Sequence, residues 1–186
     1  MTDSTKWFGW GAAAVALLGV SGALAMRRST RAFTVTTTIA RNKAAVFELH
    51  ATPASFYRVL EFKRRGDKGY TVLSVSESPD RTSLSYELSH ASALGTIRSR
   101  PLRTAIVRSG PVLSFSESFV VIGTTLQFNW RFVDTPNVAD STDVRLDIAL
   151  SGPAVSCAFL ARVKSDFEAR FETTNEHLDA LIPRSS

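Results

Sequence analysis

The segment Leu126-Gln-Phe-Asn-Trp-Arg-Phe132, together with Val144-Arg-Leu-Asp-Ile-Ala-Leu150, decides the fold of this chain. In both segments large apolar residues occupy every second position, the period of a β-strand with one buried face. Residues 134–141 between them are rich in turn-forming types. We therefore expect an antiparallel pair with one apolar face. That face carries Leu126, Phe128, Trp130 and Phe132 on one strand and Val144, Leu146, Ile148 and Leu150 on the other.

Further strand signals lie on both sides of this pair. β-Branched or alternating runs separated by turn residues predict strands at 33–39, 70–77, 81–90, 96–108, 112–122, 125–134 and 143–150. Between the first two strands, Asn42 can cap a short helix over 43–50, and Thr52-Pro53 can open a second one, from Ala54 to about Phe62. The sequence predicts an α+β domain with a curved antiparallel sheet of about seven strands.

The last long segment, Pro153 to Ile182, supplies the cover that this sheet needs. Apolar residues recur every four positions, which predicts one long amphipathic helix that starts at Gly152-Pro153 and ends before Pro183. The apolar face carries Val155, Phe159, Val163, Phe167 and Phe171. The opposite, charged side carries Lys164, Asp166, Glu168, Arg170 and Glu172.

This order of elements resembles the START-like (SRPBCC) helix-grip superfamily, which includes polyketide cyclases/dehydrases, birch-pollen-allergen-like proteins and coenzyme Q-binding proteins. The resemblance covers residues 32–182 and includes the helix at Ala44-Ala45-Val46-Phe47. It implies that the sheet grips the terminal helix around an apolar cavity for a hydrophobic ligand. The chain departs from many relatives at His50-Ala-Thr-Pro-Ala-Ser-Phe56, where they carry an aspartate-proline turn and a later tryptophan.

The resemblance and the strand alternation together suggest a cavity lining. We expect it to include Tyr86, Phe115, Glu117, Phe128, Trp130, Phe159, Val163 and Phe167, with Glu87, His90 and Arg103 as further polar side chains that can project inward. Glu117 faces inward if Phe115 and Phe119 do, and a buried carboxylate needs a partner. The opposite register would turn Ser114, Ser116 and Ser118 inward instead.

The N-terminal segment Trp7–Met26 has twenty consecutive uncharged residues, enough for a helix to cross a bilayer. Trp7 and Trp10 suit one interface, Leu17 and Leu18 the apolar centre, and the basic flank Arg27/Arg28 the cytoplasmic side. We therefore expect a single-pass anchor in residues 1–31 and a cytoplasmic domain in 32–186. The alternative is a signal peptide cleaved near Ala23-Leu24-Ala25, which would export the domain.

Composition argues against several function classes. The net charge of +5 belongs largely to the anchor region, because residues 1–31 hold four of the 22 basic and one of the 17 acidic residues, and 18 against 16 remain. Nothing therefore favours a nucleic-acid partner. Cys157 is the only cysteine and the three histidines are far apart, so we expect no disulfide, metal or cofactor.

Three functions remain open. The leading hypothesis is a non-enzymatic, membrane-tethered protein that binds a lipid, an isoprenoid or a polyketide. The alternative is a cyclase or dehydratase acting on a polyketide or aromatic substrate, with Glu117 and either Tyr86 or His90 as acid/base groups. The third is an interaction domain with a filled core and no pocket.

Overall fold

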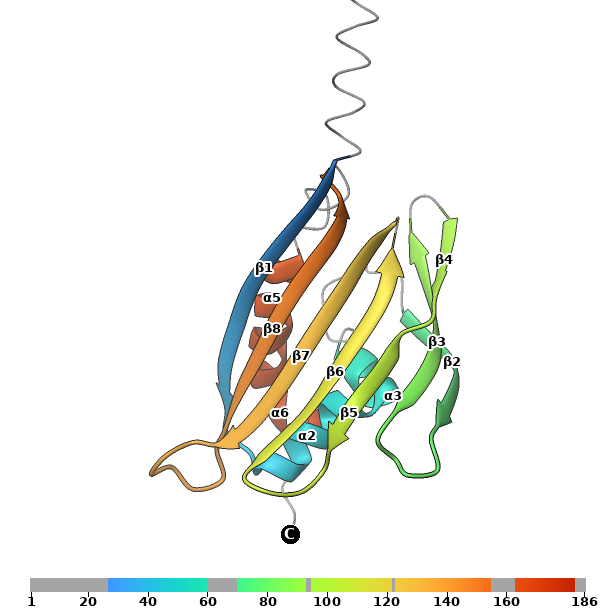
Figure 1. The fold of residues 1–186 in the computed structure, drawn as a ribbon. Coiled ribbons are helices and arrows are strands. Elements are labelled where there is room, and N and C mark those ends of the chain that lie inside the picture. The colour runs from blue at the N-terminus through green and yellow to red at the C-terminus, as the bar shows by residue number, and fades with distance from the viewer. Residues whose placement is uncertain (1–26, 60–69, 93–94, 122, 155–162, 183–186) are drawn as a thin grey trace, which may run out of the picture.

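A computed structural model describes residues 27–59, 70–92, 95–121, 123–154 and 163–182 of the 186-residue chain (Figure 1). One curved antiparallel sheet forms most of this part, and the helices lie on one side of it. The elements are β1 (Arg28–Ile39), α2 (Lys43–Ala51), α3 (Pro53–Arg58), β2 (Tyr70–Glu77), β3 (Leu84–Ser92), β4 (Gly95–Ser99), β5 (Leu102–Val107), β6 (Val112–Val121), β7 (Thr124–Asp134), β8 (Thr142–Pro153), α5 (Val163–Glu176) and α6 (Leu178–Leu181).

The strand order is β1-β8-β7-β6-β5-β3-β2, and β4 pairs with β3 outside this path. β7 and β8 form the predicted antiparallel pair, with Trp130 opposite Leu146. The strand predicted over 96–108 is in fact two strands, because Pro101 interrupts it. Proline has no backbone N–H for a sheet hydrogen bond, so β4 ends at Ser99 and β5 begins at Leu102.

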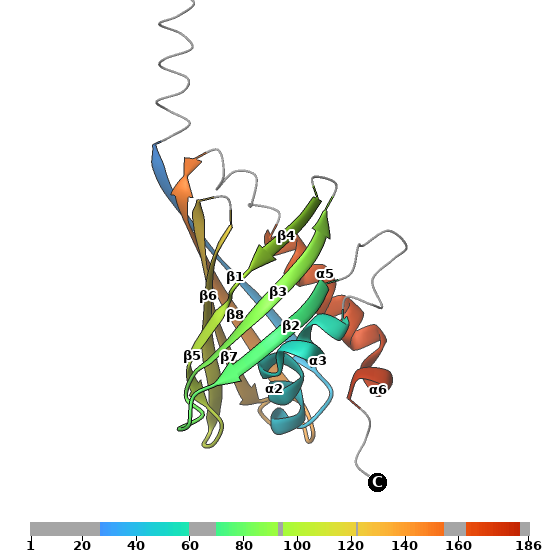
Figure 2. The ribbon, with the colours of Figure 1, turned by 90° about the vertical axis from the view of Figure 1, so that its right-hand side faces the viewer.

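The two short helices begin as predicted and cover the concave face of the sheet (Figure 2). The side chain of Asn42 caps α2 by accepting a hydrogen bond from the N–H of Ala45 at 2.9 Å. Pro53 occupies the first turn of α3, where its missing N–H costs nothing. The predicted helix around 54–62 is described only as far as Arg58, and residues 60–69 lie outside the described residues.

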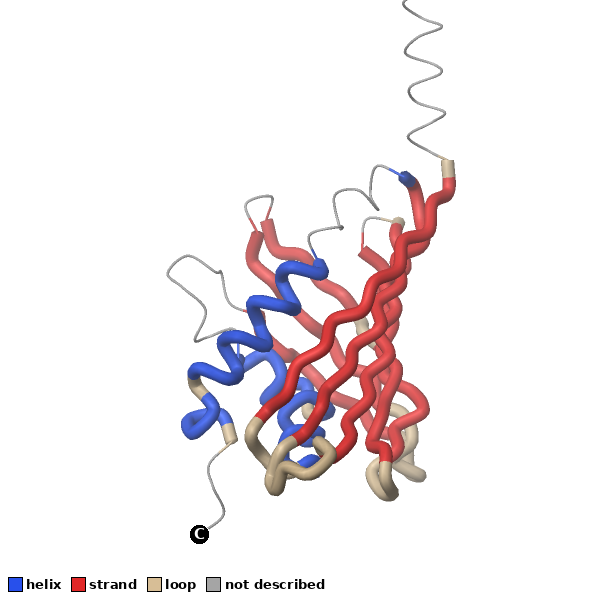
Figure 3. The backbone as a smooth tube through the Cα atoms, turned by 90° about the vertical axis from the view of Figure 1, so that its left-hand side faces the viewer, coloured by secondary structure: helices blue, strands red, loops and turns tan. Residues whose placement is uncertain are grey.

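The C-terminal helix packs against the sheet beside β1, as Figure 3 shows. β8 continues to Pro153, which pairs with Arg28 on β1, and Ala154 is the first helical residue, one residue after the predicted start. Residues 155–162 lie outside the described residues, and α5 is described from Val163. The helix is also broken at His177, after which the short α6 ends before Pro183.

Buried Arg41, between β1 and α2, fastens this C-terminal segment to the sheet. Its guanidinium donates to the C=O of Ile182 at 2.9 Å and forms an ion pair with Asp179. The C=O of Arg41 accepts a hydrogen bond from the Thr142 hydroxyl at 2.7 Å. Arg41 thus joins the end of α6 to the base of β1 and β8.

β1 begins four residues before the domain boundary expected at residue 32, because Arg28–Arg31 already pair with β8. The predicted membrane span, residues 7–26, lies outside the described residues. Among the helices that the structure does describe, none combines the length and the apolar character needed to cross a membrane.

Candidate functional site

The inner face of the sheet is built in rows that the strand register defines. Each row takes one inward-facing residue from β1, β8, β7 and β6 in turn. Counted from the α2 end, the rows are Thr37-Val144-Phe132-Leu113, Val35-Leu146-Trp130-Phe115, Phe33-Ile148-Phe128-Glu117 and Arg31-Leu150-Leu126-Phe119. The third row continues on β5 with Arg103, the register partner of Glu117.

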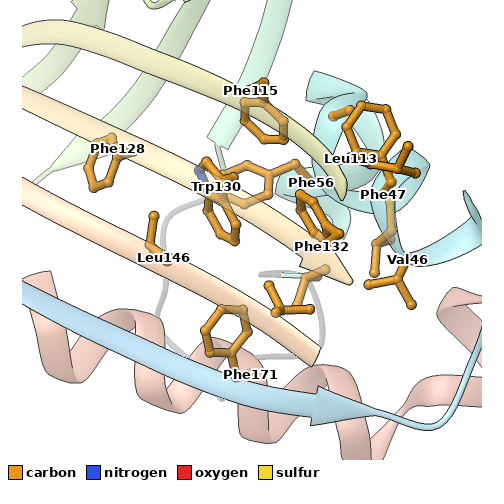
Figure 4. Close-up of a cluster of buried hydrophobic side chains, with 14 of the residues drawn as sticks. Val46, Phe47, Phe56, Leu113, Phe115, Phe128, Trp130, Phe132, Leu146 and Phe171 are labelled. Atoms are coloured by element: carbon orange, nitrogen blue, oxygen red, sulfur yellow. The ribbon is translucent and has the colours of Figure 1, made fainter. Parts of the chain in front are cut away.

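An aromatic cluster fills the rows nearest α2 and α3 (Figure 4). Trp130 lies at its centre, with ring centroids of Phe115 and Phe56 each at 5.7 Å and that of Phe171 at 6.0 Å. Phe47 contacts Phe132 edge-on at 5.5 Å. These rings are almost fully buried, so Phe115 and Trp130, both predicted to line a cavity, pack against other core side chains.

Glu117 faces inward, which answers the register question posed by the sequence. Its side chain is 4 % exposed, and it forms an ion pair with Arg103, which is 1 % exposed. The same carboxylate oxygen accepts a hydrogen bond from the Tyr86 hydroxyl at 2.9 Å, and the Tyr57 and Tyr86 hydroxyls lie 3.3 Å apart. These contacts connect four side chains in a line, which we call the buried polar chain: Tyr57, Tyr86, Glu117 and Arg103.

Arg103 also connects the sheet to the C-terminal end of α2. Its Nη1 donates to the C=O of His50 at 2.9 Å and to the C=O of Ala51. The last carbonyls of a helix lack hydrogen-bond donors inside that helix. Here the Arg103 guanidinium donates to two of them. Among the described residues, Arg103 Nη2 has no hydrogen-bond partner. The ion pair therefore also fixes the position of α2.

His50 lies fully buried beside this chain. Its Nδ1 is 2.8 Å from the C=O of Val46, while Nε2 has no hydrogen-bond partner in the part of the chain that the structure describes. The pKa of His50 is lowered to about 4, mainly by burial; the hydrogen bond with Val46 opposes this shift, and the positive charges of Arg170 and Arg103 add to it. His50 is therefore a neutral core residue at pH 7.

The two tyrosines of the buried polar chain are held as neutral phenols. Burial is the main cause that raises the pKa of both Tyr57 and Tyr86, and the negative charge of Glu117 raises these pKa values further. Tyr86 therefore acts as a hydrogen-bond donor to Glu117. Arg103 and Tyr86 together hold the Glu117 carboxylate in place.

Burial is uneven in the third and fourth rows: Leu126 and Leu150 in the fourth row are almost fully buried, whereas other apolar side chains in these rows are not. Phe119 in the fourth row and Phe33 in the third are only partly buried. The predicted lining residues on α5, Val163 and Phe167, are also only partly buried. The ring centroids of Phe167 and Phe128 are 5.2 Å apart. Predicted lining residue Phe159 lies outside the described residues.

Two hollows open at the surface among the described residues. One is a groove of about 350 Å³ between β1 and α5, with Val35 and Phe171 among its lining and Glu168 and Glu172 from α5. The other, of about 270 Å³, lies over β2 and β3 near Glu87 and Arg100. No three His, Cys, Asp or Glu side chains in the described ranges are grouped so that they could hold a metal ion.

Of the polar residues predicted from sequence, the structure brings together Tyr86, Glu117 and Arg103, but not Glu87. Glu87 faces away from Tyr86 and Leu88 along β3 and lies 3.5 Å from Arg98. His90 pairs through its backbone with Tyr70, and its side chain lies outside the described residues. Arg170, predicted on the charged side of the helix, is in fact buried, 3.9 Å over the ring of Phe56.

Sequence reasoning missed the parts of the site that come from α2 and α3. His50 and Tyr57 lie in a segment without a clear period, so periodicity did not indicate that His50 contacts Trp130 and Tyr57 contacts Tyr86. The Thr52-Pro53 turn was the available signal, because it folds α3 back against α2. The sequence indicated Arg103 as a candidate residue, but it did not predict the contact of Arg103 with α2.

No protein-family model matches this sequence, and no curated protein matches it either. Solved structures do match. The crystal structure of Ara h 8.0201 has a TM-score of 0.57 at 11% identity, covering 82% of this chain and 99% of that one. A truncated norcoclaurine synthase from Thalictrum flavum has a TM-score of 0.53 at 7% identity, covering 81% and 94%.

The di-domain ARO/CYC protein BexL of the BE-7585A biosynthetic pathway has a TM-score of 0.51 at 14% identity. That match covers 80% of this chain and 50% of BexL. Identities this low establish the fold alone. The chain therefore shares the overall fold of these structures, which agrees with the helix-grip fold expected from the sequence.

Proposed function

We propose that this protein binds a hydrophobic small molecule, such as a lipid, an isoprenoid or a polyketide, while residues 7–26 hold it at a membrane. The observation that carries the proposal is the uneven cover of the inner face. The rows around Trp130 are filled, whereas Phe33, Phe119, Val163 and Phe167 are apolar and only partly buried. Partly accessible apolar side chains in a concave interior are typical of ligand sites.

The membrane tether gives this site a supply of ligand. A poorly soluble molecule partitions into a bilayer, and a domain held there meets it at a high effective concentration. The support for the tether is the uncharged segment Trp7–Met26, followed at once by Arg27 and Arg28.

Energy transfer from Trp130 tests ligand binding. In a full chain with Trp7 and Trp10 replaced by phenylalanine, Trp130 is the single tryptophan. Addition of a dansyl-labelled fatty acid should then give saturable transfer to the dansyl group. Phe119→Gln should lose most of this signal. Val120→Gln is the matched control, because Val120 is the next residue, 61% exposed, on the other face of β6. Equal signals from the two variants would contradict the proposed site.

The buried polar chain favours a second candidate, a cyclase or dehydratase acting on a polyketide or aromatic substrate. Tyr86 and Glu117 lie at the β6 side of the third row, next to the partly covered end. Incubation with a poly-keto thioester and mass spectrometry for loss of water tests it. Turnover by the parent that falls by orders of magnitude in a folded Glu117→Gln variant would support this candidate over simple binding.

A further inference from the structure

The start of β1 and the end of the proposed membrane span are almost contiguous. The backbone N–H of Ala154 donates to the C=O of Arg27 at 2.9 Å, and Arg28 pairs with Pro153. The span ends at Met26, so Arg27 alone separates it from the sheet. Each extended residue covers at most about 3.6 Å, which places this end of the sheet within about 7 Å of the end of the span.

The strand register identifies the other residues at this end. Thr30 pairs with Ser151, Ser151 with Thr125, and Thr125 with Val120. Figure 1 shows the starts of β1 and β7 and the ends of β6 and β8 together at the upper end of the sheet. We call this end the upper rim; it comprises Arg27, Arg28, Thr30, Arg31, Val120, Thr125 and Ser151.

The upper rim is basic and lies beside the partly covered part of the interior. Arg27, Arg28 and Arg31 are exposed, and within the described residues none of them forms an ion pair. Arg31 also belongs to the fourth row, whose far member is the partly buried Phe119. Exposed arginines at a membrane surface are attracted to anionic headgroups.

Resting on the function proposed above, we propose that the upper rim lies against an anionic lipid surface. A hydrophobic molecule then passes between the bilayer and the fourth row of the grip without crossing bulk water. The partner of the rim is the lipid bilayer itself. The opposite end of the sheet, at the β7–β8 connection, then points away from the bilayer.

Two exposed valines report on this orientation. Val120 lies at the upper rim, whereas Val138 lies in the connection between β7 and β8, and they are 61% and 54% exposed. β1 has 12 residues, so the two ends of the sheet are about 36 Å apart along the strands. In a full chain carrying Cys157→Ser, we would label Val120→Cys or Val138→Cys with nitrobenzoxadiazole and reconstitute each in phosphatidylcholine vesicles containing headgroup-nitroxide lipid.

The label at position 120 should be quenched several-fold more than the label at 138. Phosphatidylserine in the vesicles should increase this difference and added salt should reduce it, because salt screens the arginines. Equal quenching of both labels in vesicle-bound protein would overturn the orientation and leave ligand binding intact. Release of the protein by alkaline carbonate would overturn both the tether and the orientation.

A flexible linker provides the functional counterpart. A glycine-serine insertion between Met26 and Arg27 should slow the uptake of dansyl fatty acid from vesicles several-fold. The plateau of energy transfer should stay the same, because the plateau measures binding and the rate measures access. An unchanged rate would contradict the inference, and a missing plateau in the parent would contradict the proposed function instead.

Discussion

Arg103 and Glu117 are register partners on β5 and β6, and their side chains meet as an ion pair on the inner face of the sheet. Aromatic rings surround the pair, with the guanidinium carbon 4.9 Å from the Phe115 centroid and 5.2 Å from that of Tyr86. Because Arg103 also binds the last carbonyls of α2, this contact fixes the helix against the sheet and organises the buried polar chain.

Removing one charge of this pair should be costly. Glu117→Gln leaves the Arg103 guanidinium buried without its counter-ion, and we expect the free energy of unfolding to fall by about 3–5 kcal/mol. Urea unfolding of the full chain in detergent measures this. Asp134→Asn is the control. Asp134 is 70% exposed and forms an ion pair with Lys43, so this substitution should change the stability little. Similar effects of both substitutions would contradict a structural role for the pair.

His50 should make stability depend on pH. Its folded-state pKa of about 4 lies below the ordinary value of 6.5, so below pH 6.5 the unfolded chain takes up a proton that the folded protein does not. The free energy of unfolding should therefore fall as the pH drops from 6.5 toward 4, by at most about 3 kcal/mol. His50→Phe should remove this part of the pH dependence. Parallel stability curves for parent and variant would contradict the assignment.

Arg41 should control the attachment of the C-terminal helix. We expect Arg41→Met to cost about 1.5–3 kcal/mol, because the C=O of Ile182 loses a charged donor. Hydrogen exchange should speed up most at Leu178–Leu181. Asp179→Asn is a milder companion, since Asp179 is 83% exposed. Unchanged exchange in α6 of Arg41→Met would show that other contacts hold the helix.

Much of this fold could be predicted from strand alternation. β7 and β8 appear with the predicted inward residues, because a sheet with one buried face imposes a two-residue period. The β2 limits also match the prediction. The ends were less accurate: β1 and β8 extend to Arg28 and Pro153 because they pair with each other, and pairing between residues so distant in sequence leaves no local signal.

The candidate site was predictable only in part. Alternation on β6 offered two faces for Glu117, and the structure turns this residue inward, opposite Arg103. Arg170 shows the converse limit, since a charged residue on a helix normally faces solvent. Here the ring of Phe56 lies 3.9 Å from its guanidinium carbon, a contact that requires α3 to fold against α5.

The membrane tether makes a prediction independent of the site. Alkaline carbonate should leave the full chain in the membrane pellet. Replacing Leu17, Leu18 and Val20 by arginine should release it, because each charge near the centre of a span costs about 2.5–3.5 kcal/mol on insertion scales. A mature protein whose N-terminal residue is Met26 would instead indicate a cleaved signal peptide.

The central claim is that the partly covered end of the grip holds a hydrophobic molecule. Its most direct test is mass spectrometry of organic extracts from the full chain purified out of its native membranes, beside Phe119→Gln and Val120→Gln purified identically. The account predicts a hydrophobic species in stoichiometric amount with the parent and with Val120→Gln, and its loss from Phe119→Gln. The absence of any such species from the parent, or its equal retention by Phe119→Gln, would contradict the account.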